Sequence, residues 1–106
     1  MKKSFPLHVT GKADARVLDA IKHDVRKYVQ RERRKTLPEG FDLWNFDCKV
    51  GPEPAGATPC ALGDISGAVD AVALGGAPAV YIEILASPGH RNATPMDSSA
   101  GPARGP

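Results

Sequence analysis

The feature that most constrains this chain is a long amphipathic helical pattern over residues 14–35. Its apolar residues recur with helical spacing and occupy an arc of about 120° at 100° per residue. They are Val17, Leu18, Ile21, Val25, Tyr28 and Val29. Asp14 suits the first turn of such a helix, and Pro38 and Gly40 end it. The pattern predicts a helix that packs on a core along one stripe.

Three further segments alternate apolar and polar residues, which is typical of strands with one buried face. They cover residues 3–10, 43–50 and 79–86. The side chains expected to point inward are Phe5, Leu7 and Val9 in the first segment, Trp44, Phe46, Cys48 and Val50 in the second, and Val80, Ile82 and Ile84 in the third. Residues 57–62 predict a weaker strand, because Pro59 lacks the N–H that a strand ladder needs. A short helix is predicted over residues 65–74, with Asp64 as its N-cap.

The order β-α-β-(β)-α-β indicates an α+β two-layer sandwich. With the weak strand it matches the ferredoxin-like plan, in which two helices cover one face of an antiparallel sheet. Without that strand, the sheet has three strands. Residues 1–86 are expected to form this single domain. Residues 87–106 are rich in Pro, Gly and Ser and have no aromatic residue, so they are expected to form a disordered tail.

Several classes of protein are excluded by what the chain lacks. No run of about 18 apolar residues is present, so a membrane-spanning helix is excluded. The first residues lack the apolar run of a secretory signal, which predicts a cytoplasmic protein. Two cysteines are too few for a disulfide framework or a four-ligand zinc site. Phosphate-binding loops, GxGxxG, HExxH and the nucleophile elbow are absent, so we expect no cofactor, no metal and no enzymatic activity.

Four segments resemble a small family of bacterial proteins, the domain of unknown function 6172. They are MKKSFPL, AIKHDVRKYVQRERRKTLPEG, WNFDCKVG and YIEILASPGHR, and the resemblance spans residues 1–91. The segment GPEPAGATPCALG departs from the family pattern, in which this region is more plainly strand-like. The resemblance implies a bacterial cytoplasmic setting, and it implies neither an activity nor catalytic residues.

Charge is divided unevenly along the chain. Residues 1–35 hold eleven Lys and Arg against four Asp and Glu, whereas residues 36–106 hold three against eight. On the helical wheel Lys22, Arg26 and Arg33 fall together beside the apolar stripe. The far flank carries Arg16, Lys27, Arg31 and Arg34. Such a helix can bind phosphates through counterion release. The alternative is a solvated face whose last cations complement the helix dipole.

The outward residues of the predicted strands form a second candidate, an acid–base site on the open sheet face. They are His8, Asp47, Lys49, Tyr81 and Glu83. In the ferredoxin-like plan the first and last strands are neighbours, so His8 is expected near Tyr81 or Glu83, with Asp47 remote. The alternative is an ordinary solvated sheet face.

The two cysteines form a third candidate. A hairpin centred on Pro54 places Cys48 opposite Cys60, either as a redox pair or as packing. The inward position of Cys48 favours packing, because a buried thiol is normally inert.

The remaining candidates are weaker. Residues 88–91 contain His90 and Arg91, which form either an anion-binding segment or the first turn of the tail. His23 is expected to be solvated. Trp44 is expected to anchor the core rather than to serve as a stacking platform, because it shares a strand face with Phe46 and Val50.

These observations favour a non-enzymatic binding module that contacts RNA or another polyanion through its basic helix. The contacting residues are expected to be Lys22, Arg26, Arg33 and Arg34. The alternative is a protein–protein interaction module that uses the open sheet face or an exposed strand edge. The salt dependence of binding distinguishes the two functions, because binding to phosphates weakens steeply as salt is added.

Overall fold

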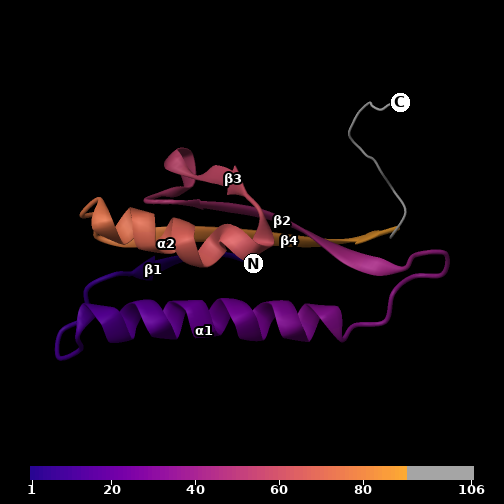
Figure 1. Cartoon of the computed structure of the whole chain (residues 1–106), viewed down its shortest axis with the longest axis horizontal. Coiled ribbons are helices and arrows are strands. Elements are labelled where there is room, and N and C mark those ends of the chain that lie inside the picture. Colours follow the sequence, from indigo (N-terminus) through magenta and orange to yellow (C-terminus); the bar gives the residue numbers. More distant parts are fainter. Residues whose placement is uncertain (91–106) are drawn as a thin grey trace.

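The strand β4 (Ala79–Gly89) lies inside a four-stranded antiparallel sheet with the order β1-β4-β2-β3. The structure is a computed structural model that describes residues 1–90. β4 pairs with β1 (Lys2–Pro6) along its first half and with β2 (Leu43–Gly51) along nearly its whole length. β3 (Thr58–Cys60) adds a short strand on the other side of β2. The pair of β4 and β2 is therefore the longest part of the sheet (Figure 1).

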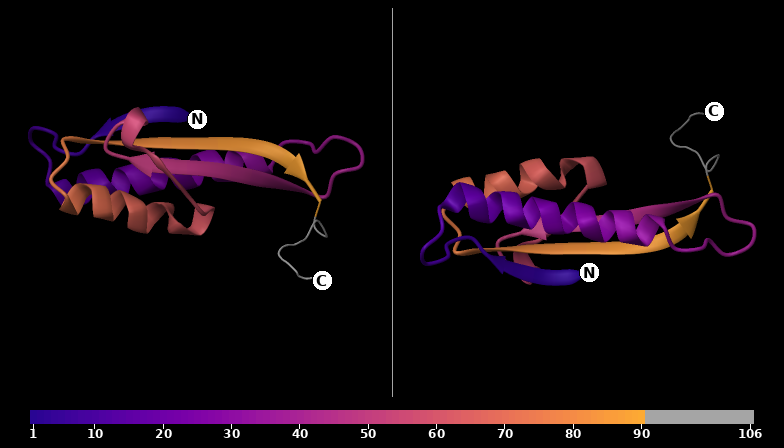
Figure 2. Two further views of the ribbon diagram at one scale, coloured as in Figure 1. Left: turned by 90° about the horizontal axis from the view of Figure 1, so that it is seen from above. Right: turned by 90° about the horizontal axis from the view of Figure 1, so that it is seen from below.

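Two helices connect these strands. α1 (Asp14–Arg33) leads from β1 to β2 and runs along the sheet, as the view from below shows (Figure 2). This crossover separates β1 from β2, and β4 lies between them. α2 (Ile65–Leu74) leads towards β4 and packs on β2, β4 and α1. The 3₁₀ turns η1 (Pro54–Gly56) and η2 (Leu62–Asp64) precede and follow β3.

One apolar core joins both helices to the sheet. Its buried members are Phe5, Leu7, Val17, Ile21, Val25, Val29, Cys48, Val50, Ile65, Val69, Val80, Ile82 and Ile84. The largest fully buried side chains include Ile82 and Ile84 of β4. No polar or charged side chain is buried within residues 1–90, so burial of apolar surface is the main force that holds the domain together.

The predicted α+β class, with two helices and an antiparallel sheet, is confirmed. The ferredoxin-like arrangement is not confirmed, because the last strand lies inside the sheet and the first strand lies at its edge. The first and last strands are neighbours, as predicted, but β2 is a neighbour of β4 as well. Alternation along a strand determines which face is buried and leaves open which strands pair.

The strand ends differ from the prediction at two places. β1 ends at Pro6, so His8 and Val9 lie outside the sheet. β4 continues to Gly89 rather than to residue 86, because the first residues of β2 pair with it. Residues 87–89 are thus a strand rather than the start of the tail, and residues 91–106 lie outside the described part of the chain.

The weak strand predicted over residues 57–62 forms as β3. It lies at the edge of the sheet, where Pro59 can be tolerated without a ladder hydrogen bond on its outer side. The turn before it approaches β2 closely. A Cβ atom at Gly51 would meet the backbone of Gly56 and Ala57, so only glycine fits at the end of β2.

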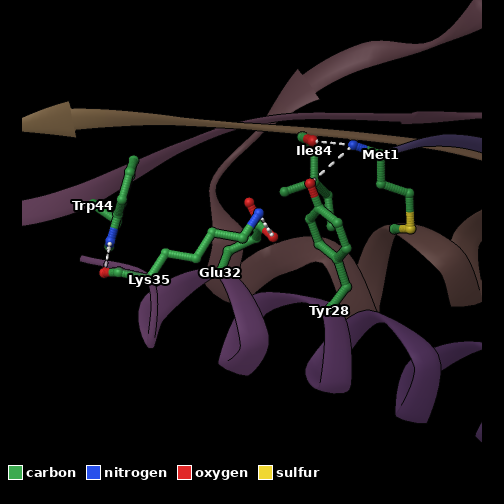
Figure 3. A network of polar contacts seen from close by, with 6 residues as sticks. All are labelled: Met1, Tyr28, Glu32, Lys35, Trp44 and Ile84. Atoms are coloured by element: carbon green, nitrogen blue, oxygen red, sulfur yellow. Dashed lines mark hydrogen bonds and ion pairs between the residues drawn. The ribbon is translucent and has the colours of Figure 1, made fainter. Parts of the chain in front are cut away.

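The prediction that Trp44 anchors the core is wrong. Its side chain is half-buried and lies outside the core cluster. Its indole Nε1 donates a hydrogen bond of 3.1 Å to the backbone oxygen of Lys35, just past the end of α1 (Figure 3). The ring therefore closes the gap between β2 and the last turn of the helix.

The position of β4 predicts which substitution is most damaging. Ile82→Ala should lower the free energy of unfolding by about 2–5 kcal/mol, because it opens a cavity at a fully buried site. Leu74→Ala is the control, because Leu74 is 86% exposed. It should change the free energy by less than about 0.5 kcal/mol. Urea denaturation measures both, and equal losses would contradict the described core.

Candidate functional site

A groove runs along one side of α1. Its other wall is formed by η2 and the first half of α2. Its first hollow has a volume of about 200 Å³ and is lined by Lys22, Val25, Arg26, Leu62, Gly63, Ile65, Ser66 and Val69. A second hollow of about 260 Å³ shares Val25, Arg26 and Leu62 with the first and extends to Arg33. We call the two hollows together the helix groove.

The helix groove has an apolar floor and a basic rim. Val25, Ile65 and Val69 are buried beneath it. Lys22, Arg26 and Arg33 follow one side of α1 and span roughly 16 Å at 1.5 Å per residue. No acidic side chain of the described residues lines either hollow. The structure therefore brings three of the four predicted contact residues to one groove.

Lys22 is the least available of these cations. Its Nζ atom lies 2.8 Å from Oδ1 of Asp70 on α2, and only 20% of its side chain is exposed. The pair joins the two helices. Because Asp70 already balances much of its charge, Lys22 contributes less than a free lysine to an external anion.

Arg26 and Arg33 are exposed and more available. Among the described residues neither has a carboxylate within ion-pair distance. The guanidinium of Arg33 lies 5.5 Å from the ring centroid of Phe46 on β2, which is within the range of a cation–π contact. A guanidinium held on a ring keeps its N–H donors free for a phosphate.

Arg34 does not join this group. It is the C-cap of α1, its backbone N–H donates to the Arg31 carbonyl, and it lines neither hollow. Arg31 itself lies over the ring of Tyr28, on the side of α1 that faces β4. Arg34 lies apart from Lys22, Arg26 and Arg33, as the helical wheel indicates, and its contact with RNA or another polyanion stays a prediction.

The side of α1 that faces β4 is closed. The Met1 nitrogen donates to the Tyr28 hydroxyl at 3.1 Å and to the Ile84 carbonyl at 2.6 Å (Figure 3). Glu32, whose side chain is only 12% exposed, pairs with Lys35 at 2.8 Å. These contacts fill the space between α1 and β4, so the open side of the helix is the one that faces α2.

The predicted acid–base site on the open sheet face does not assemble. His8 lies outside the sheet, and its Nδ1 is 3.1 Å from Oδ1 of Asp14. Asp47 is not remote from β4, because it pairs with Leu85 in the ladder. Without His8, the face lacks the imidazole on which the predicted acid–base site depends.

What remains on the open face is a polar ladder. In register, Lys2 and Lys49 lie on either side of Glu83. The Tyr81 hydroxyl donates to Oε1 of Glu83 at 2.9 Å. Burial, together with the hydrogen bond and charge of Glu83, raises the pKa of Tyr81 above its usual value, so this phenol stays protonated at neutral pH. The row combines the exposed Lys2 and Lys49 with the buried Tyr81, so only part of this face is solvated.

The hairpin prediction for the cysteines is confirmed, because Cys48 and Cys60 are directly opposed between β2 and β3. Both are free thiols. Burial, with the nearby Cys60 and Asp47, raises the pKa of Cys48 from 9.0 to about 11. Burial and Asp64 raise the pKa of Cys60 as well. Thiols of this kind are poor nucleophiles at neutral pH, which favours packing over redox chemistry.

Sequence reasoning missed one contact at the end of the sheet. The rings of Phe41 and His90 are stacked, with centroids 4.9 Å apart. Phe41 precedes β2 and His90 follows β4, so neither belongs to a periodic pattern that could have placed it. His90 thus packs on the domain rather than beginning a tail. Arg91 lies outside the described residues.

Two further features, a cluster of metal ligands and a membrane-spanning helix, are absent from the described residues. Within residues 1–90 no three His, Cys, Asp or Glu side chains gather to hold a metal ion. In the same range, neither helix is long and apolar enough to cross a membrane. His23 is exposed on α1, as expected.

Comparison with known protein families identifies the family of this chain. A family model described as a family of unknown function (DUF6172) matches residues 1–95. No curated protein and no solved structure matches the chain.

The raised thiol pKa predicts how stability depends on pH. The unfolded state loses the Cys48 proton near its ordinary pKa of 9.0, whereas the folded state keeps it until about 11. The free energy of unfolding should therefore fall as the pH rises through this interval. Cys48→Val should make that fall shallower, measured by urea denaturation from about pH 8 to about pH 10.5. Identical pH dependence in both proteins would contradict the burial of this thiol.

Proposed function

Because the chain belongs to this family of unknown function, whose description assigns no activity, we propose a function from the site itself. The protein is a non-enzymatic module that binds RNA or another polyanion along the helix groove. The observation that carries the proposal is the position of Arg26 and Arg33, which are exposed on one rim with no ion-pair partner among the described residues. Unpaired guanidinium groups are the usual partners of phosphate oxygens.

The proposal gives the predicted contact residues unequal roles. Arg26 and Arg33 are the main phosphate contacts. Lys22 is shared with Asp70 and contributes less. Arg34, at the end of α1, adds to the long-range attraction of an anionic ligand without lining the groove. Gly63 and Ser66 border the groove at the start of α2, where the N-cap residue Asp64 places a negative charge at the positive end of the helix dipole.

The proposed setting is the bacterial cytoplasm. Both cysteines are free, although they are opposed in the ladder. Opposed thiols are more often kept reduced in a compartment with glutathione or thioredoxin than in an oxidising one.

A second candidate function is protein interaction through a strand edge. β3 pairs only with residues 48–50 of β2, so residues 43–47 present an edge that no described strand covers. Leu85, on the open face beside it, is 43% exposed. An uncovered edge and an exposed apolar side chain are features of β-strand addition.

The test compares two double variants that remove the same charge. Arg26→Gln with Arg33→Gln should weaken binding to single-stranded RNA several-fold at about 50 mM salt. The slope of log affinity against log salt should shrink by up to about 1.4 units, at roughly 0.7 per phosphate contact. Gln keeps helix propensity close to that of Arg, so stability should change little. Fluorescence anisotropy of a labelled oligonucleotide measures both quantities.

The matched control is Lys27→Gln with Arg34→Gln, on the other side of α1. It should leave the affinity within about twofold of the wild type and reduce the slope only slightly, because these residues act at a distance. Equal weakening by both pairs would show an effect of net charge without a site. If the wild type has no RNA affinity at about 50 mM salt, the polyanion function is wrong and the strand-edge candidate replaces it.

A further inference from the structure

Aromatic rings gather where the helix groove ends. The groove reaches Arg33, near the end of α1, and this is also where β2 begins and β4 ends (Figure 1). Four rings lie at this end of the domain, from Phe41, Trp44, Phe46 and His90. We call them the aromatic end. None of the four is fully buried, so core packing alone does not explain why they are there.

Two of these rings are held against the basic end of α1. Trp44 and Phe46 are two residues apart on β2 and share the face that points to the helix. Phe46 lies under the Arg33 guanidinium, and the Trp44 indole donates to the Lys35 carbonyl. Figure 3 shows the Trp44 ring standing between β2 and the last turn of α1. The rings are thus fixed in place next to the cations before any ligand arrives.

The other two rings are more exposed. Phe41 and His90 stack on each other at 4.9 Å, and 38% of Phe41 remains accessible. The backbone N–H of Asp42 donates to the Gly89 carbonyl at 3.0 Å, which ties the segments that carry the two rings together. A ring pair held in this way presents an apolar face at low entropic cost.

Proteins that bind single-stranded nucleic acid combine cations that track the backbone with rings on which bases stack. Bases in a duplex are already stacked on each other and offer no free face to a ring. We propose that the aromatic end stacks unpaired bases, and that the ligand of the helix groove is therefore single-stranded RNA. Its phosphates lie along Arg26 and Arg33, and its bases reach Trp44 and the stacked pair of Phe41 and His90. This inference rests on the proposed function and adds the class of ligand.

The first experiment uses the fluorescence of Trp44, which is the only tryptophan in the chain. A single-stranded oligouridine should quench this fluorescence as it binds, because a stacked base lies directly on the indole. An RNA duplex of the same length should bind more weakly at about 50 mM salt. Heparin, a polyanion without bases, should bind through the cations and leave the fluorescence nearly unchanged.

The second experiment separates stacking from charge by substitution. Trp44→Leu should weaken binding of the single strand roughly fivefold or more and leave the salt slope unchanged, because no phosphate contact is lost. Trp44→Phe restores a ring and should recover most of the affinity. Phe41→Ser should weaken binding in the same way. Leu85→Ser is its matched control, since it removes an apolar side chain of similar exposure from the open sheet face.

Each outcome tests the base-stacking inference, the proposed function, or both. Quenching by the single strand, with loss in Trp44→Leu and recovery in Trp44→Phe, supports base stacking. A different result is that Arg26 and Arg33 contribute to the salt dependence of RNA binding, whereas Trp44→Leu and Phe41→Ser bind RNA as the wild type does. In that case the base-stacking inference is wrong and the proposed function stands. If Trp44→Phe loses as much as Trp44→Leu, the indole hydrogen bond to Lys35 positions the site and stacking is wrong. Absence of any RNA binding overturns both.

Discussion

The pairing of β4 on both of its edges is the constraint on which the rest of this domain depends. β4 is the last strand in the chain, yet it pairs with β1 on one edge and β2 on the other. Its inward residues Val80, Ile82 and Ile84 are fully buried. β1 and β2 are therefore separated by the width of β4, and α1 is the crossover that connects them.

This crossover determines which side of α1 is open. The side towards β4 is filled by Tyr28, Glu32 and the end of the chain at Met1. The side towards α2 meets the η2 turn and α2, to which the Lys22–Asp70 pair joins it, and the helix groove lies between them. The basic residues on this side thus line one rim of a hollow with an apolar floor. Because its cations are spread along the helix, the ligand that we propose is an extended polyanion.

Much of this arrangement could be predicted from the sequence, and the reasons for the rest are physical. The helices and strands follow from periodicity, and the placement of Cys48 opposite Cys60 follows from the symmetry of a hairpin about Pro54. The pairing of β2 with β4 could not be predicted, because period-two patterns do not encode strand order. The sequence misplaced His8 because β1 ends at Pro6, before the alternating pattern ends. The sequence also predicted that Trp44 is buried in the core. Alternation along β2 cannot show that α1 ends before it covers this residue.

The central claim is that the side of α1 facing α2 is the binding surface of this protein. The most direct measurement is the change in backbone and indole N–H chemical shifts when single-stranded RNA is added to ¹⁵N-labelled protein at low salt. The account predicts that the largest changes lie along residues 22–33, at the start of α2 and at the Trp44 indole. Changes centred on Lys49 and Glu83 of the open sheet face, or spread evenly over all basic residues, would contradict it.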